Sequence, residues 1–224
     1  MGTFSLEKRD AMYWLGRYTE RVYTTLKAFY DYYDKMIDRD PNIYIKLCDR
    51  LDIPNIYDNP NEFIHNFLFD QSNPDSVYLS LNRAMDNGIM LRNEITSETL
   101  AYIQMALDLY GASTSSDVPT MALLPVQDYL LAFWGSLDDN ARDQRCRDII
   151  KCGKYIERLD LYYRLYYPAD KIEKELCKLI NRLPRTGMPY QPQLMDELVS
   201  VCRDPNRQKG WRMQCAHKLY HLIG

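Results

Sequence analysis

One eight-residue pattern occurs twice in this chain, at residues 15–22 and again at residues 152–159. The first copy is Leu-Gly-Arg-Tyr-Thr-Glu-Arg-Val and the second is Cys-Gly-Lys-Tyr-Ile-Glu-Arg-Leu. Two unrelated amphipathic helices would share their apolar positions, but they would have no reason to share glycine, tyrosine, glutamate and arginine in one order. The pattern therefore predicts two related helices that form an internal repeat.

Wound at about 100° per residue, each copy places its apolar residues on one face, which predicts a buried face in both helices. The residues of these faces are Leu15, Tyr18, Val22, Leu26 and Phe29 in the first copy and Cys152, Tyr155, Leu159, Tyr163 and Tyr166 in the second. The other side of each helix carries a glycine one turn before a glutamate: Gly16 before Glu20, and Gly153 before Glu157. Glycine inside a helix destabilises it by roughly 0.5–1 kcal/mol relative to alanine, so both positions indicate close approach by a neighbouring backbone or a ligand.

The two glutamates are the candidate functional residues of the repeat. Ile150, Leu161 and Leu165 leave apolar side chains nearly all round the second helix, so Glu157 is expected to be buried. A buried carboxylate has to be hydrogen-bonded and paired with a cation, or it shifts towards its neutral form. Two interpretations stay open: Glu20 and Glu157 are structural members of buried ion pairs, or they bind a ligand or take part in catalysis.

The expected cation is an arginine from the middle of the chain. Arg92 falls on the apolar face of a helix predicted from about residue 73 to residue 94. Its guanidinium stays charged, so on a buried face it requires an acid opposite. We expect Arg92 to meet Glu20 and Glu157 in a polar centre of the bundle. Three glycines would provide the room there: Gly16, Gly88 and Gly153.

The rest of the sequence predicts an all-α fold, since no segment alternates with the period of two that is typical of a strand. The expected helices span residues 6–37, 43–51, 61–69, 73–94, 97–110, 120–135, 138–167, 170–183, 193–202 and 208–223. The small, polar stretch 111–119 indicates a connection between two halves of the bundle. We expect one helical domain over residues 1–224, with the repeat helices at 6–37 and 138–167 and a C-terminal helical extension at 169–223.

Composition argues against several classes of protein. A net charge of −3 and a pI near 5.7 give no reason to expect nucleic-acid binding. No apolar run approaches the roughly 18 residues that span a bilayer, and Met1–Asp10 lacks the apolar core of a signal peptide. Six cysteines without a CxxC pair then predict free thiols in a reducing compartment, so we expect a cytoplasmic protein without a membrane partner.

The motifs of several enzyme classes are also missing from the sequence. It has no phosphate-binding glycine loop, no GxSxG and no HExxH. Neither repeat glutamate has a histidine three residues on, as a di-iron helical bundle requires. His217 and His221 share a helix face, but we interpret this spacing near the C-terminus as incidental. We therefore predict no metal site, while the identity of any cofactor stays open.

Three stretches of the chain resemble the bacterial alpha-E domain family. Residues 12–21 are similar to the opening signature of that family, and residues 153–160 are similar to its second glutamate motif. The central stretch of the chain is also similar to that of the family, at Ser80, Leu81, Asp86, Asn87, Arg92 and residues 95–98. The three motifs occur in the family's order, and the resemblance extends over most of the chain up to about Tyr167.

The chain departs from the family pattern at two places. Tyr23 and Thr24 stand where the family tends to have a Glu-Asn pair, and Asn93 replaces a usual aspartate. Asp160 retains the acidic residue of the second motif. The resemblance therefore implies that the first half-site is weakened and that the second is kept.

The resemblance implies an all-helical domain associated with circularly permuted ATP-grasp amidoligases and transglutaminase-like proteins, which are its expected partners. In a first hypothesis the domain is a component of a peptide- or amide-bond-forming modification system and binds or acts on an amino-acid-like or peptide substrate. Its site would consist of the catalytic residues Glu20 and Glu157 and the substrate-binding residues Arg17, Arg21, Arg92, Arg158, Asp160, Asn87 and Tyr13. In a second hypothesis the domain is a non-catalytic docking subunit for an ATP-grasp ligase, and the Glu/Arg centre is purely structural. Whether the protein is an enzyme stays open, and a homo-oligomer is compatible with either hypothesis.

Overall fold

The computed structural model describes residues 4–114, 119–204 and 206–223. Throughout these ranges the fold is helical, and strand-like pairing is limited to one isolated bridge between Tyr190 and Ile223. The helices are α1 (Leu6–Asp38), η1 (Pro41–Ile43), α2 (Tyr44–Leu51), α3 (Pro60–Phe69), α4 (Val77–Met90), α5 (Arg92–Ile95), α6 (Ser97–Ser113), α7 (Pro119–Ala122), α8 (Leu124–Asn140), α9 (Gln144–Arg164), α10 (Ala169–Thr186), α11 (Pro192–Arg203) and α12 (Trp211–Tyr220). The predicted all-α class is confirmed.

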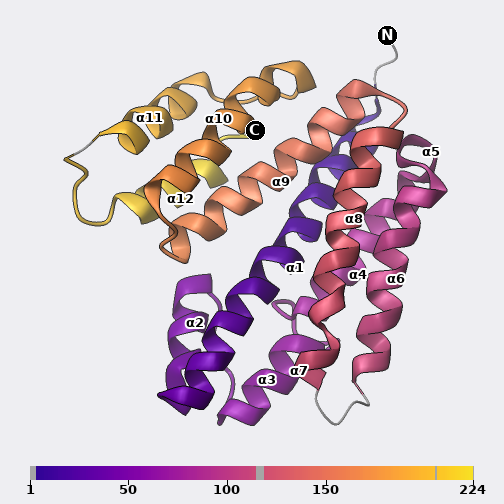
Figure 1. Cartoon of the computed structure of the whole chain (residues 1–224). Coiled ribbons are helices and arrows are strands. Elements are labelled where there is room, and N and C mark those ends of the chain that lie inside the picture. Colours follow the sequence, from indigo (N-terminus) through magenta and orange to yellow (C-terminus); the bar gives the residue numbers. More distant parts are fainter. Residues whose placement is uncertain (1–3, 115–118, 205, 224) are drawn as a thin grey trace.

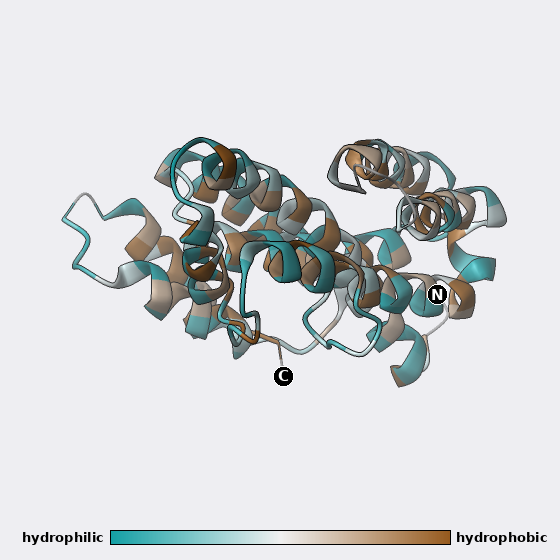
Figure 2. Cartoon of the chain, turned by 90° about the horizontal axis from the view of Figure 1, so that it is seen from below, coloured by the Kyte–Doolittle hydropathy of each residue, from teal (hydrophilic) through white to brown (hydrophobic). Residues whose placement is uncertain are grey.

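The long helix α1 runs through the centre of the molecule and organises the others around it (Figure 1). On one side it packs against α4, which meets α6, and α6 in turn pairs with α8. On the other side it packs against α9, whose outer face is covered by α10 and α12. Apolar and polar residues are interspersed along the helices, as in amphipathic helices (Figure 2). The two helices that bear the repeated pattern are therefore direct neighbours.

Helices α1 and α9 touch backbone to backbone at their glycines. A Cβ atom on Gly16 would lie 1.9 Å from the carbonyl oxygen of Ile150, and one on Gly153 would lie 2.1 Å from that of Tyr13. Ile150 precedes Gly153 by three residues, just as Tyr13 precedes Gly16, so the contact is reciprocal. The predicted close approach of a neighbouring backbone at both glycines is confirmed. The contact says nothing of common ancestry, so the internal repeat stays a prediction.

Side-chain caps explain several helix starts. Ser5, Ser76 and Thr96 accept hydrogen bonds from backbone amides in the first turns of α1, α4 and α6. The predicted start of the second repeat helix at residue 138 is wrong, because α8 continues to Asn140. Asp143 instead caps α9 by accepting from the amides of residues 145 and 146. The helix starts after Asp143 because this side chain satisfies amides that have no partner within the first turn of the helix.

Other predicted boundaries also shift. The helix expected at 120–135 divides at Leu123 into α7 and α8, where Pro125 occupies the first turn of α8. Helix α10, which was expected to end at residue 183, continues past Pro184 to Thr186. Helix α4 ends at Met90, and the short α5 follows it. Residues 115–118 of the expected connection lie outside the described residues.

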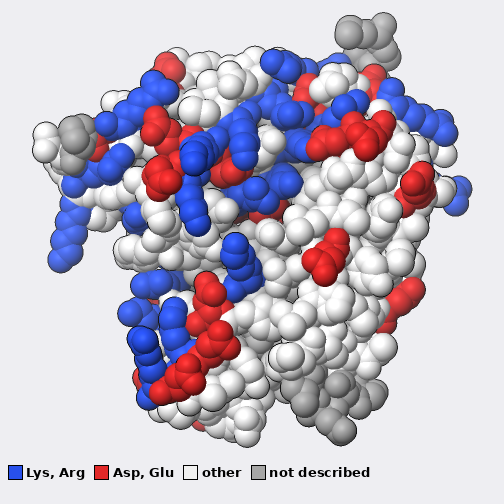
Figure 3. Space-filling model, in the orientation of Figure 1, with Lys and Arg blue, Asp and Glu red and all other residues white. Residues whose placement is uncertain are grey.

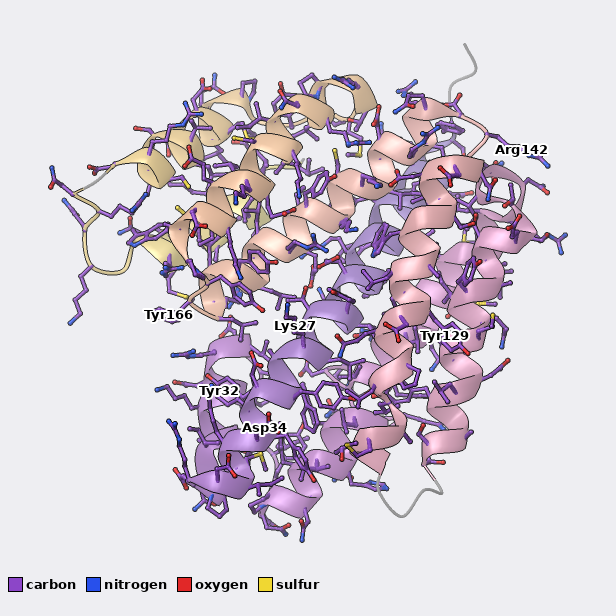
Figure 4. The ribbon with its side chains drawn as sticks, viewed as in Figure 1. Lys27, Tyr32, Asp34, Tyr129, Arg142 and Tyr166 are labelled. Carbon is purple, nitrogen blue, oxygen red and sulfur yellow. The ribbon has the colours of Figure 1, made fainter. Side chains whose placement is uncertain are left out.

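The second repeat helix ends earlier than predicted. Helix α9 stops at Arg164, and Tyr166 takes a left-handed backbone conformation with φ of 61°. Tyr166 is 57% exposed and lies over Arg50 of α2, so its predicted place in the core is wrong (Figure 4). Its counterpart Phe29 is buried because α1 continues for two more turns.

Among the helices that the structure describes, none is both long and apolar enough to cross a membrane.

Candidate functional site

Glu157 of α9 is the centre of a buried ion cluster. Its carboxylate oxygens lie 2.6 Å from Nε of Arg17 and 2.5 Å from Nε of Arg21, both on α1. Only 1% of Glu157 is exposed. Burial acts to raise the pKa of Glu157, but Arg21 and Arg17 outweigh it and lower the pKa to about 2. Glu157 is therefore a permanent anion near neutral pH and a poor proton acceptor.

Glu20 of α1 forms the corresponding cluster with the other motif. Arg158 of α9 donates Nε and Nη2 to the two oxygens of Glu20 at 2.7 and 2.8 Å. Thr24 donates its hydroxyl to the same carboxylate at 2.6 Å. The arginine that follows each glutamate in sequence thus pairs with the glutamate of the opposite helix. This exchange explains why a Glu-Arg dipeptide stands in both helices.

The surroundings of the two clusters differ. Lys154 stands at the position in the second motif that Arg17 occupies in the first. It is 8% exposed and places Nζ 3.9 Å from the ring centroid of Trp134, on α8. Burial, together with Arg158 and Lys151, lowers the pKa of Lys154 to about 7 although nearby carboxylates oppose the shift. The Glu20 cluster is thus enclosed, and none of its three residues borders the cavity beside Glu157.

A cavity of about 520 Å³ opens beside the Glu157 cluster. It lies between α1 and α9, with further walls from the ends of α2 and α3, the start of α4, and α12. Five of its charged side chains come from the two central helices: Arg17, Arg21, Glu157, Asp160 and Arg164. Its volume is within the range of ordinary small-molecule sites.

Asp160 and Arg164 form a second charged pair in the wall of this cavity. Nε of Arg164 lies 3.0 Å from both oxygens of Asp160, and its Nη1 lies 3.0 Å from Asp52. Burial is the main cause that raises the pKa of Asp160; Glu157 adds to it, whereas Arg164 and Arg17 oppose it. Among the cavity carboxylates that the structure describes, Asp160 is therefore better suited than Glu157 to exchange a proton.

Arg17 and Arg21 are held in place but keep donors available. Each uses Nε for Glu157, and within the part of the chain that the structure describes neither reaches a second carboxylate at ion-pair distance. Arg17 stacks over Trp14 with 5.0 Å to the ring centroid, and Arg21 over Tyr18 with 5.4 Å. Such stacking fixes the plane of a guanidinium. Their terminal nitrogens can therefore bind an anionic group, because guanidinium groups pair readily with carboxylates and phosphates.

The structure contradicts the predicted pairing of Arg92 with Glu20 and Glu157. Arg92 is exposed in the short helix α5, and both repeat glutamates take their cations from the opposite repeat helix. Gly88 also lies away from the polar centre, packed against side chains of Leu100, Ile103 and Leu15. The helix predicted at 73–94 ends at Met90. Arg92 therefore does not lie on the buried face of this helix, as its periodicity had predicted.

Some of the other predicted site residues border the cavity, and some do not. Arg17, Arg21, Glu157 and Asp160 border the cavity. Other predicted site residues lie outside it. Tyr13 packs beside Arg17, and Asn87 donates to the carbonyl of Arg83 within α4. Glu20 and Arg158 lie in the enclosed cluster.

The sequence prediction missed several cavity residues. Arg164 occupies the position that corresponds, at the offset of the two copies, to Lys27 of the first helix, which is exposed, and it lies outside the eight-residue pattern. Asp52, Asp75 and His217 come from distant segments, and no motif connects them. In the described ranges no three His, Cys, Asp or Glu side chains are grouped as a metal site.

Comparison with known proteins identifies a family match. The model of the Alpha-E family, described as a predicted alpha-helical domain with a conserved ER motif, matches residues 9–175. The matched range contains the Glu-Arg dipeptide of both central helices. It ends within α10, so α11 and α12 lie beyond it. Searches of curated proteins and of solved structures find no match.

Proposed function

This chain belongs to the Alpha-E family, and on that premise we propose that its cavity binds an amino-acid-like or peptide substrate for a peptide- or amide-bond-forming modification system. The observation that carries the proposal is the pairing of available arginine donors with carboxylates in one cavity. Arg17 and Arg21 offer positive charge, and Asp160 offers negative charge, along the same wall. A zwitterionic ligand needs both signs within one small space.

Each charged residue has a distinct part in this proposal. Arg17 and Arg21 bind the carboxylate of the ligand, because each uses Nε for Glu157 and its terminal nitrogens make no ion pair with the other described residues. Asp160 pairs with an ammonium group, because among the described residues it has one guanidinium partner, Arg164, where Glu157 has two. Glu157 is a positioning residue, since two guanidinium groups already surround its carboxylate. Glu20 positions Arg158 in the enclosed cluster and has no contact with the ligand.

Isothermal titration of the full chain with zwitterionic dipeptides tests the proposal. Arg21→Met is the informative variant, because Arg17 still neutralises Glu157 when Arg21 is removed. We expect it to weaken binding of a dipeptide with a free carboxylate at least tenfold, and to leave the already weak binding of the matching dipeptide amide unchanged. Lys27→Met removes an exposed charge from the same helix and serves as the matched control. Equal affinity for acid and amide would refute carboxylate recognition by the arginines.

A second candidate function is docking of an ATP-grasp ligase through α6 and α8, favoured by a separate observation. Residues 93–141 contain no lysine or arginine but have seven acidic residues. Over α6 and α8 the surface is mostly uncharged, with isolated acidic side chains (Figure 3). Exposed apolar residues add to this face: Met105, Met121, Leu124 and Leu131. Such a surface suits a partner with an apolar patch bordered by basic residues.

Co-elution of the chain with an ATP-grasp amidoligase on gel filtration tests this second function. Leu131→Asp places a charge on α8, where the native side chain is exposed and contributes little to stability. We expect loss of co-elution for Leu131→Asp and no change for Lys27→Met. Failure of the wild-type chain to co-elute would exclude docking of that ligase.

A further inference from the structure

The cavity beside Glu157 has walls of two kinds. Its charged residues come mainly from α1 and α9, as described above. The walls from α2, α3 and α12 are largely apolar, with Leu51, Ile53, Phe67 and Leu219 among their residues. A ligand that fills the whole cavity must therefore carry a charged end and an apolar part.

Helix α12 contributes both buried and exposed side chains to the cavity. The helix is anchored by its buried residues Cys215, Ala216 and Leu219. Trp211, whose ring meets that of Tyr163 edge to face, and Arg212, which donates to the carbonyl of Tyr167 at 2.8 Å, add to this anchoring. In contrast, Met213 and Tyr220 border the cavity while being 47% and 76% exposed. Large apolar side chains left half exposed at a cavity are available to cover a ligand.

One part of the apolar wall, the part from α12, lies outside the family match. All the charged cavity residues of α1 and α9 lie within residues 9–175, whereas α12 lies beyond that range. The charged wall thus belongs to the shared domain, and the α12 wall is an addition to it. An added wall that contacts a different part of the ligand can change specificity without altering the carboxylate site.

We infer that α12 is the specificity element of this cavity and that it selects ligands with an apolar or aromatic side chain next to a free carboxylate. This inference rests on the proposed function, because it takes the arginines as the carboxylate site. The side chain packs against Met213, Leu219 and Tyr220, and His217 borders the same wall as its polar edge. The volume of about 520 Å³ accommodates a ligand of dipeptide size.

Titration calorimetry with Gly-Phe, Gly-Leu, Gly-Gly and the amide of Gly-Phe tests this inference on the full chain. We expect the wild type to bind Gly-Phe and Gly-Leu at least about tenfold more tightly than Gly-Gly, since burial of a large apolar side chain contributes that much. The double variant Met213→Ala with Tyr220→Ala should lower the affinity for Gly-Phe to that for Gly-Gly. Its affinity for Gly-Gly should stay unchanged. Both substituted side chains are exposed, so the variant is expected to fold.

The possible outcomes distinguish a failure of the inference about α12 from a failure of the proposed function. Met105→Ala removes an exposed methionine from α6, which does not border the cavity, and is the matched control. Equal wild-type affinity for Gly-Phe, Gly-Leu and Gly-Gly would overturn the role of α12 and leave carboxylate binding in place. So would a double variant that weakens all dipeptides equally. Absence of binding to every dipeptide, or equal binding of Gly-Phe and its amide, would overturn the proposed function and the inference with it.

Discussion

Gly16 and Gly153 each lie against the backbone of the other's helix, at a residue one turn before the opposite glycine. No side chain fits at either position, because a Cβ atom would lie 1.9 or 2.1 Å from a carbonyl oxygen. This close crossing brings Glu20 within reach of Arg158, and Glu157 within reach of Arg17 and Arg21. The glycines and the ion clusters are therefore parts of one arrangement.

Alanine at either of these glycines is expected to separate the two central helices. We predict that Gly16→Ala and Gly153→Ala each destabilise the protein by about 3 kcal/mol or more, since backbone atoms cannot move aside as a flexible side chain can. Gly135→Ala on α8 is the control, because a Cβ there meets nothing within 4 Å. It should be neutral or stabilising by about 0.5–1 kcal/mol. Urea denaturation measures all three, and a neutral Gly16→Ala would contradict the close crossing.

Removal of Arg158 leaves the buried carboxylate of Glu20 without its cation. We predict that Arg158→Met lowers the free energy of unfolding by about 3–5 kcal/mol. Arg92→Met should change it by no more than about 0.5 kcal/mol, because Arg92 is exposed. A double-mutant cycle of Arg158→Met with Glu20→Gln should show strong coupling, and the same cycle with Arg92→Met should show none. Coupling between Arg92 and Glu20 would restore the arrangement predicted from the sequence.

The lowered pKa of Glu157 makes stability sensitive to acid. Glu157 has a folded pKa of about 2 and an unfolded pKa near 4.5, so the unfolded chain binds more protons between these values. The stabilisation is fully present above pH 4.5 and is lost as the pH falls through 2. We predict that the difference in unfolding free energy between the wild type and Glu157→Gln shrinks by roughly 2 kcal/mol from pH 6 to pH 3. Chemical denaturation at both pH values measures it, and a constant difference would refute a strongly lowered pKa.

Lys154 has the opposite dependence on pH. Its folded pKa of about 7 lies below the ordinary value of 10.5, so the unfolded chain binds more protons between pH 7 and pH 10.5. The cost of burying the charged amine is fully present below pH 7 and declines as the pH rises. We predict that Lys154→Met is more stable than the wild type at pH 7. This advantage in the free energy of unfolding should shrink by roughly 2 kcal/mol between pH 7 and pH 9, because the wild type gains stability as the pH rises. Denaturation at these two pH values tests this, and parallel stabilities would show that the amine titrates normally.

Several features of the fold and the site could be predicted from the sequence. The helical class, the start of α1, the cap at Thr96 and the close approach at both glycines depend on local patterns, which a sequence shows directly. The need of Glu157 for a cation also follows from its apolar surroundings along one helix. Boundaries were less predictable where one polar cap competes with another, as at Asp143.

The sequence by itself determined that this protein is helical, that two of its helices carry matched glycines and glutamates, and that those glutamates require cations. Only the tertiary structure decided which cations they receive. Glu157 and Arg17 are 140 residues apart, and their contact depends on how α1 crosses α9. The cavity likewise joins segments from α1 to α12, so no single stretch contains it. Local periodicity specifies which side of a helix is buried, whereas the packing of distant helices specifies what that side meets.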